Sequence, residues 1–354
     1  MSWHIVYLEF TSPTHFGSDE RGIGVENVRT AFSADTLFSA LCNAWARYQI
    51  LTPAEMEGLR DRFNTEPPFL LSSAFPWVAG KIEAHYLPKP LVECQWLNEF
   101  PGEVYEKVLL KKTLKKAAYV PAPYFQHWLE PSESLLEDKV LDDIAAEMTG
   151  FQNETVTHIR PQHAQDRLTG ASELYHLGQV SYNRDLSGLY FVVQLLDAAW
   201  ENILNQALQA LAVEGIGGER NFGLGRFAVD WSHGQLMDLA DIDELQFIIP
   251  NSEAANGRLF CVLAPFHPME AEYTVIQHDI ACRYSLIRKK GWSFSHRTFH
   301  QMKKASVTVF GEGSVFTQQP RGEVLDIQPN DFPHPLYRYA KPLAVPLKPE
   351  GGAA

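Results

Sequence analysis

The sequence predicts an α+β fold of two units, the first of them ferredoxin-like. Up to about Trp231, segments typical of strands and helices follow the order strand, helix, strands, helix, strand. The chain is 354 residues long, and a single hydrophobic core rarely organises so many. A second group of strand-like segments begins near Arg258. We therefore expect a second unit after the first.

The first unit opens with a strand, a long loop and a helix. Residues Trp3 to Phe10 are rich in aromatic and β-branched side chains, which favours a strand. A polar loop that contains glycine follows, from Thr11 to Arg29. Ser33 is a typical helix N-cap. The apolar residues after it recur at helical spacing, namely Leu37, Phe38, Leu41, Cys42, Trp45 and Tyr48.

Proline-rich segments interrupt the next part of the chain and predict an irregular insertion from about residue 60 to 155. Within it, five lysines lie between Lys107 and Lys116, and an acidic helix is expected from about Pro131 to Met148. The basic and acidic stretches either pair with each other or face different partners. A solvated surface is the simpler explanation of both and is favoured.

The chain then becomes rich in strands again and ends in the second unit. The segments expected as strands are 179–182, 189–195, 226–231, 259–264, 306–310 and 343–347, with a helix at 198–213. Acidic residues between Asp238 and Glu244 mark a linker. We accordingly predict a first domain over 1–235, a second over 236–348 and a disordered tail over 349–354.

Composition excludes several classes of protein. The four cysteines form no C-x-x-C pair, which argues against a zinc ribbon or a redox dithiol. The opening MSWHIVYLEF lacks the pattern of a signal peptide, and no stretch has the roughly 18 apolar residues of a membrane span, so we expect a cytoplasmic protein. The formal net charge of −13 disfavours nucleic-acid binding unless basic residues cluster locally.

A glycine-rich loop is the strongest single feature. Five glycines lie in the eleven residues from Gly215 to Gly225, together with Arg220 and Asn221, and Arg226 follows. Glycine lets a ligand approach the main chain, successive N–H groups bind anions, and arginine matches phosphate. The loop follows a helix and precedes a strand, the reverse of Walker and Rossmann loops, so it predicts no dinucleotide site. A connection without a ligand is the alternative.

Several stretches resemble the RAMP superfamily of CRISPR-associated proteins. GIGGERNFGLGR at 215–226 is similar to the glycine-rich signature of that superfamily. Three further pairs of stretches resemble the fourth Csm subunit of type III-A effector complexes or segments shared by RAMP subunits. They are HFG at 15–17 with SADTLFSAL at 33–41, PFLLSSAFP at 68–76 with LPKPL at 87–91, and RPQ at 160–162 with DRLTG at 166–170. The resemblance extends from the first strand to about Trp231 and is weaker beyond.

The resemblance implies a fold and a role. It implies two ferredoxin-like (RRM-like) domains, with the glycine-rich loop and the insertion in the first. It implies a non-catalytic subunit of the type III-A (Csm) complex, a ribonucleoprotein of antiviral defence. The subunit would anchor the 5′ handle of the crRNA, dock the large palm-domain (polymerase-like) Csm subunit and abut the adjacent RAMP backbone subunit. No cofactor, metal or membrane is implied.

Residues able to bind RNA through phosphate contacts or stacking occur in four segments. From Arg283 to Lys304, seven Lys or Arg residues occur without an Asp or Glu, and Trp292, Phe294 and Phe299 are interleaved. A solvated hairpin tip is the alternative for this stretch. The candidate RNA-binding residues are His15, Phe16, Arg21, Arg29, Arg160, Arg167, Arg184, Gly217, Gly218, Arg220, Asn221, Gly223, Gly225, Arg226, Arg288, Lys289, Lys290 and Arg297.

Three other functions stay open from the residues alone. A metal-independent endoribonuclease that processes precursor crRNA needs a general acid and base, for which His15, Tyr48 and His176 are candidates. A metal site is disfavoured, because His296 and His300 share helical spacing but lack the Glu of H-E-x-x-H. A scaffold without RNA contact would not need the arginines of the glycine-rich loop.

Overall fold

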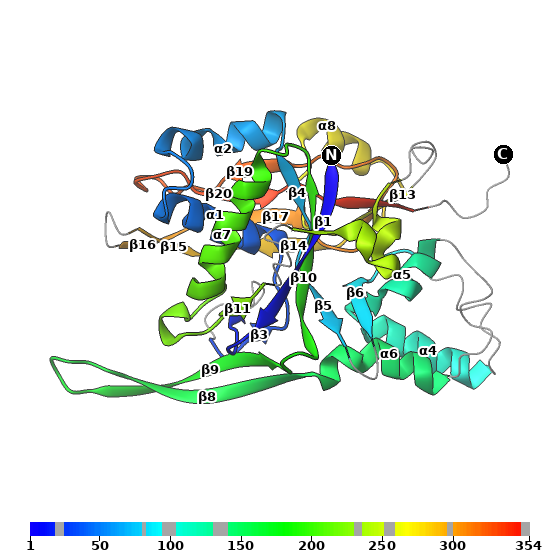
Figure 1. The fold of residues 1–354 in the computed structure, drawn as a ribbon, viewed down its shortest axis with the longest axis horizontal. Coiled ribbons are helices and arrows are strands. Elements are labelled where there is room, and N and C mark those ends of the chain that lie inside the picture. Colours follow the sequence, from blue (N-terminus) through cyan, green and yellow to red (C-terminus); the bar gives the residue numbers. More distant parts are fainter. Residues whose placement is uncertain are drawn as a thin grey trace.

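A large antiparallel sheet with helices on both faces dominates the fold (Figure 1). The computed structural model describes residues 1–17, 25–79, 83–93, 104–129, 141–229, 236–250, 259–295 and 300–347. The strands of the sheet are β1 (Ser2–Phe10), β4 (Phe69–Leu71), β5 (Phe75–Val78), β6 (Ala84–Pro88), β7 (Tyr119–Pro121), β10 (Ser187–Leu195), β11 (Phe227–Ala228) and β12 (Met237–Asp238). Their order is β11, β1, β10, β5, β6, β7, with β12 beside β1 and β4 beside β10. The predicted α+β class is confirmed.

The strands β1 and β10 occupy the centre of this sheet and carry apolar side chains on both faces. They pair antiparallel along most of their length. Because successive side chains of a strand point to opposite faces, Val6 and Leu8 lie in one core whereas Trp3 and Ile5 lie in the other. The sheet therefore separates two hydrophobic cores and needs cover on both sides.

Two helices predicted from the sequence cover the first face. Helix α1 (Ala34–Arg47) begins directly after Ser33, and α7 (Trp200–Glu214) lies beside it. The indole N–H of Trp45 in α1 donates to the carbonyl of Ile203 in α7 at 3.2 Å. Helix α2 (Pro53–Thr65) follows α1 in the chain and begins with a capping box made by Thr52 and Glu55.

The insertion covers the second face and is more regular than predicted. It contains α4 (Val104–Lys116), α5 (Ala122–Leu129) and α6 (Leu141–Asn153). Helices α4 and α6 pack together, and Leu110 and Ile144 are fully buried in the second core. The prolines at 121 and 123 flank or begin α5 instead of breaking structure, because the first turn of a helix tolerates proline. The predicted helix start near Pro131 lies outside the described residues.

Two hairpins leave this framework. The short one joins β2 (Phe16–Gly17) to β3 (Val28–Arg29), and the long one joins β8 (Thr155–Gln165) to β9 (Ser172–Tyr182). The long hairpin projects from the body of the molecule at the lower left of Figure 1. Its turn is closed by Asp166, whose carboxylate accepts the main-chain N–H groups of Leu168 and Thr169. These two hydrogen bonds lower the pKa of Asp166.

The predicted acidic linker is wrong in one respect, because its apolar residues are buried against the first sheet. Strand β12 pairs with β1, and two short 3-10 helices follow, η4 (Leu239–Asp241) and η5 (Asp243–Ile248). Leu239, Leu245 and Ile248 are almost fully buried in the second core. The domain boundary at residue 235 stays a prediction.

The C-terminal part, from residue 259 onward, consists of small antiparallel sheets. Strands β13 (Leu259–Val262), β18 (Val315–Phe316) and β21 (Ala344–Leu347) form one of them. The others are the pairs β14 (Leu286–Lys289) with β17 (Val307–Phe310), β15 (Trp292–Ser295) with β16 (His300–Lys303), and β19 (Glu323–Asp326) with β20 (Tyr337–Ala340). The described residues here include one short helix, α8 (Glu270–Ile276). Two ferredoxin-like domains are therefore not confirmed. Among the described helices, none has the length and apolarity to cross a bilayer.

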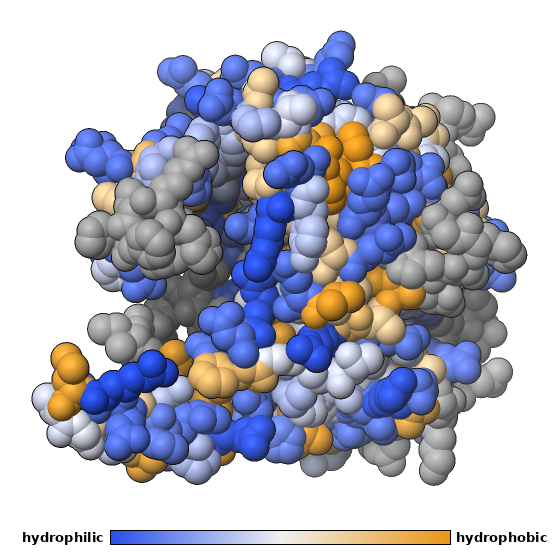
Figure 2. Space-filling model, turned by 60° about the vertical axis from the view of Figure 1, so that its left-hand side comes forward, coloured by the Kyte–Doolittle hydropathy of each residue, from blue (hydrophilic) through white to orange (hydrophobic). Residues whose placement is uncertain are grey.

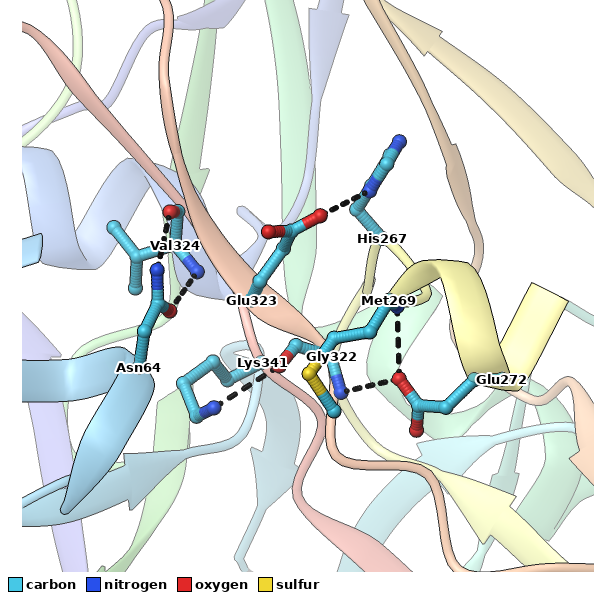
Figure 3. Close-up of polar contacts among 8 residues, drawn as sticks. All are labelled: Asn64, His267, Met269, Glu272, Gly322, Glu323, Val324 and Lys341. Atoms are coloured by element: carbon cyan, nitrogen blue, oxygen red, sulfur yellow. Dashed lines mark hydrogen bonds and ion pairs between the residues drawn. The ribbon is translucent and has the colours of Figure 1, made fainter. Parts of the chain in front are cut away.

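Polar side chains hold the start of β19 in place, and one of them joins the C-terminal part to the first unit (Figure 3). The side-chain amide of Asn64, at the end of α2, donates to the carbonyl of Val324 at 3.1 Å and accepts the N–H of Val324 at 2.7 Å. It thus makes the pair of hydrogen bonds that a neighbouring strand would make. One residue earlier, Glu323 accepts from His267 at 3.1 Å. The buried ammonium of Lys341 donates to the carbonyl of Gly322 at 3.0 Å. Asn64 thus joins β19 to α2 of the first unit, whereas His267 and Lys341 hold the start of β19 within the C-terminal part.

Candidate RNA-binding site

A pocket of about 300 Å³ lies where the first unit meets the C-terminal part. Four elements line it: the loop and hairpin around β2 and β3, helix α1, the glycine-rich loop and the C-terminal part. Most of these elements lie in the left half of Figure 1, the side that Figure 2 brings forward, where a hollow opens above the long hairpin. The sequence segments proposed for RNA binding therefore include several that meet in space.

The lining is strongly basic although the chain is acidic. The cations that line the pocket are Arg29, Arg220, Lys290, Lys304 and Arg338. Asp35 is the single carboxylate among the described lining residues. Helix α1 adds a polar face, with Thr36, Ser39 and Asn43 at helical spacing. A lining of this kind fits a ligand that carries several negative charges.

The glycines of the loop are explained first by contacts within the protein. Gly225 has φ +78°, and a Cβ there would lie 2.1 Å from the carbonyl oxygen of Ile216. The N–H of Gly225 donates to Pro13 at 2.8 Å, and the N–H of Gly218 donates to the carbonyl of His15 at 2.9 Å. For these two N–H groups, the predicted role as anion donors is wrong. The glycines instead seat the loop against residues 13–17, which brings Arg220 to the pocket.

Arg220 is held at the rim by Glu214, the last residue of α7. Its guanidinium lies 3.7 Å from the Glu214 carboxylate and its side chain is 38% exposed. The same carboxylate binds Arg47 at 3.1 Å and accepts the hydroxyl of Tyr48 at 2.5 Å. The hydrogen bond to Glu214 raises the pKa of Tyr48. Tyr48 is thus a donor to a structural carboxylate, and the described lining residues do not include it.

His15 and Phe16 form a wall of the pocket. The Nδ1 of His15 lies 2.8 Å from the carbonyl oxygen of Gly178. Because a carbonyl oxygen only accepts, Nδ1 carries the proton and Nε2 of the neutral ring is an acceptor. Phe16 is 4% exposed and its ring centroid lies 4.9 Å from that of Phe32. Phe16 is therefore part of the core, which corrects its expected use for stacking on bases.

A buried ion cluster closes the inner end of the pocket. Asp35 lies 3.2 Å from the ammonium of Lys289 and accepts hydrogen bonds from Ser33 and Arg338. Burial alone would raise the pKa of Asp35, but Lys289 and Arg338 lower it to about 2. Lys289 is 1% exposed and also donates to Ser33 at 2.7 Å. Its expected contact with RNA is therefore wrong, because its charge is used inside the protein.

Arg338 is the principal residue that the sequence did not indicate. It lies in β20 and is 7% exposed, yet it lines the pocket. Its Nη1 donates to Asp35, whereas its buried Nε has no hydrogen-bond partner within the described part of the chain. An unsatisfied buried donor beside a pocket is costly unless a ligand or water completes it. Thr36, Ser39 and Asn43 were also missed, although their spacing on a helix was visible in the sequence.

The remaining candidates lie elsewhere. Of the 18 candidate residues, His15, Phe16, Arg29, Gly217, Gly218, Arg220 and Lys290 line the pocket. Those that do not line it, apart from the buried Lys289, are exposed or belong to the loop framework, namely Arg160, Arg167, Arg184, Asn221, Gly223, Gly225, Arg226 and Arg288. Arg21 and Arg297 lie outside the described residues. His176 is exposed on β9, and no cluster of metal ligands occurs among the described residues.

Comparisons with known proteins agree with the resemblance seen in the sequence. Residues 255–347 match the family described as the CRISPR Csm4 C-terminal domain. The chain is 27% identical over 98% of its length to the CRISPR system Cms protein Csm4 of Streptococcus thermophilus, all of which is covered. It is 28% identical over 90% of its length to the Csm4 of Thermococcus onnurineus, of which 92% is covered.

Solved structures agree at the level of the fold. A chain of the Csm1–Csm4 cassette in complex with AMPPNP covers 99% of this chain, with a TM-score of 0.57 and 18% identity, and is itself wholly covered. The predicted resemblance to the fourth Csm subunit is thus confirmed. The family match falls in the C-terminal part, where the resemblance read from the sequence was weaker.

Proposed function

We propose that this chain is a non-catalytic subunit of a type III CRISPR effector complex that holds the 5′ handle of the crRNA. The observation that carries the proposal is the pocket, where five cations surround a single carboxylate in a chain of net charge −13. Relatives along the whole chain are named Csm4, and one solved relative comes from a Csm1–Csm4 cassette. We place the chain in a type III-A complex of the cytoplasm, beside a large palm-domain subunit and a RAMP backbone subunit.

We also infer that the first unit is ferredoxin-like. Its chain order β1, α1, β4 and β5, β10, α7, β11 is the β-α-β-β-α-β order of such units. In space β1 and β10 are central and both helices lie on one face. We infer a ferredoxin-like unit in the C-terminal part as well, with less support, because its strands form several small sheets.

The pocket suits the backbone of single-stranded RNA. Arg29, Arg220 and Arg338 offer forked donors, and Lys290 offers a flexible ammonium. These groups come from four separate segments, so an RNA strand that enters the pocket would bridge both parts of the chain. Each phosphate neutralised by such a contact contributes about −0.7 to the slope of log K against log salt for a single strand.

The same geometry supports binding without cleavage. Nε2 of His15 is an acceptor at the pocket wall, as a general base would require. Of the two other residues considered for proton transfer, Tyr48 donates to Glu214, and the described lining residues do not include His176. We therefore propose that His15 positions Gly178 and the glycine-rich loop and transfers no proton.

The test is binding of a fluorescent RNA that carries the 5′ handle. Binding is measured by fluorescence anisotropy at salt concentrations from about 50 to about 200 mM. Arg220→Ala should weaken binding about five- to tenfold and make the slope shallower by about 0.7. Arg62→Ala is the matched control, because Arg62 is 40% exposed, pairs with Asp197 at 3.1 Å and lies outside the pocket. It should bind like the wild type.

Two results would overturn the proposal. One is a failure of the wild-type chain to bind the handle RNA even when the large subunit is present. The other is RNA cut by the wild type but left whole by His15→Ala, which would favour the endoribonuclease.

A further inference from the structure

Strand β14 and the residues on either side of it present an unusual outer surface. From residue 284 to 292 every second side chain is exposed, whereas those between them are half-buried or buried. The exposed side chains, which we name the outer stripe, are Tyr284, Leu286, Arg288, Lys290 and Trp292. Within β14 the alternation follows from the period of two in a strand, which turns Lys289 inward to Asp35 and Arg288 outward. Trp292 begins the next strand, β15, directly after Gly291.

The outer stripe combines exposed apolar and cationic groups along a short stretch of the chain. Leu286 is 62% exposed and Trp292 is 60% exposed. Single exposed apolar residues are ordinary on protein surfaces, but here they alternate with Arg288 and Lys290 along one line. Aromatic side chains interleaved with cations are the pattern of surfaces that bind single-stranded nucleic acid.

Charge around Trp292 is also of one sign. In the register of β15 and β16, Trp292 lies opposite Lys303. Arg288 donates from Nε to the hydroxyl of Ser306 at 2.9 Å, which fixes its guanidinium next to β17. The sequence from Arg283 to Lys304 contains no carboxylate. A negatively charged strand would therefore meet attraction along the whole stripe.

The outer stripe is continuous with the pocket. Lys290 belongs to both, and the main-chain N–H of Lys304, another lining residue, donates to Gly291 at 2.9 Å. Trp292 follows Lys290 by two residues, so the chain keeps their Cα atoms within about 7 Å of each other. This distance is comparable to that between a phosphate and the base of the same nucleotide.

We propose that Trp292 is a stacking platform for one base of the bound RNA, whose phosphate is held by Lys290. The RNA strand then leaves the pocket over the outer stripe, toward Arg288 and Leu286. The proposal rests on the proposed function, because it requires RNA in the pocket. It adds a base contact to the phosphate contacts described above.

The experiment is an abasic scan. A labelled handle RNA is prepared as a series in which one nucleotide at a time lacks its base, and each is bound to wild type and to Trp292→Ala. Trp292→Ala should weaken binding of the intact RNA about fivefold or more, since one stacked base contributes about 1–3 kcal/mol. One abasic position should weaken wild-type binding to a similar extent and add nothing in Trp292→Ala. The salt slope should be unchanged, because no phosphate contact is lost.

Two controls accompany the scan. Trp292→Phe keeps an aromatic face and should retain most of the affinity. Tyr273→Ala removes an aromatic side chain that is 54% exposed in α8, outside the outer stripe and the pocket, and should change nothing.

The outcomes separate this proposal from the proposed function. If wild type binds and Lys290→Ala weakens binding, but no abasic position couples to Trp292, the stacking platform is refuted and the pocket stands. If Trp292→Ala leaves RNA binding unchanged and weakens association with a partner subunit, the outer stripe is a protein interface instead. If wild type fails to bind RNA at all, both proposals fall.

Discussion

Replacing Asp35 with alanine tests whether buried charge holds the two parts of the chain together at the pocket. Asp35 lies in the first turn of α1, whereas its partners Lys289 and Arg338 lie in β14 and β20. Their side chains are 9%, 2% and 7% exposed, so the cluster is almost dry. Asp35→Ala leaves two buried cations without their counter-charge. Breaking a buried pair in this way costs about 3–5 kcal/mol.

The measurement is urea unfolding followed by two independent probes. Asp35→Ala should lower the free energy of unfolding by about 3–5 kcal/mol, the amount expected when a buried pair is broken. Glu66→Ala is the control, because Glu66 pairs with Arg62 at 3.1 Å but is 82% exposed, and it should lose less than about 1 kcal/mol. An Asp35→Ala protein within about 1 kcal/mol of wild type would refute the reasoning.

The pH dependence of the free energy of unfolding tests the same interaction in a second way. The pKa of Asp35 is about 2 in the folded chain, below the usual value of about 3.9. A lowered pKa stabilises the fold above the unfolded-state pKa, and that stabilisation is lost as the pH falls through the folded-state pKa. The shift corresponds to roughly 2–3 kcal/mol. The stability difference between wild type and Asp35→Asn should therefore be constant above about pH 5 and shrink between pH 4 and pH 2. A difference that is undiminished at pH 2 would contradict this assignment.

Two further predictions concern the glycine-rich loop and the junction of Figure 3. Gly225→Ala should destabilise the chain by at least about 1–3 kcal/mol, because its φ of +78° is strained for alanine. Gly58→Ala, in open space on α2, should stabilise the chain by about 0.5–1 kcal/mol. Equal melting temperatures for the two variants would contradict the glycine assignment. Asn64→Ala removes both hydrogen bonds to the main chain of Val324. It should lower the free energy of unfolding by about 1–3 kcal/mol and speed amide hydrogen exchange at Val324. Unchanged exchange would show that the junction does not depend on Asn64.

The elements that the sequence predicted well are those with a local signal. Strand β1 was expected from its aromatic and β-branched residues, and its observed bounds, Ser2–Phe10, differ by one residue. Helix α1 followed from Ser33 and the apolar spacing after it. The glycine-rich loop was placed correctly between a helix and a strand because Gly215 ends α7. Each of these inferences depends on neighbours along the chain.

The features that sequence reasoning missed depend on contacts between distant residues. Arg338 and Asp35 are 303 residues apart, so nothing local marked Arg338 as part of a pocket. The acidic segment after residue 237 was taken for a linker because its charges outweighed Leu239, Leu245 and Ile248, which the sheet buries. Lys289 was grouped with its basic neighbours, although the period of a strand places it on the opposite face. A count of charges cannot make that distinction, but a strand assignment can.

A carboxylate in the middle of a basic pocket has a physical rationale in this arrangement. Both oxygens of Asp35 are occupied by Ser33, Lys289 and Arg338, so two cations and one anion leave the cluster with about one positive charge. Asp35 therefore subtracts little from the attraction for phosphate while it fixes the direction of Arg338. Ordering a free arginine side chain on binding costs about 0.5–1.5 kcal/mol, and a side chain already ordered avoids that cost. Screening over about 8 Å at physiological salt keeps the acidic surface elsewhere from cancelling the local field. The net charge of the chain and the sign of its pocket are thus independent, and affinity for RNA follows the pocket.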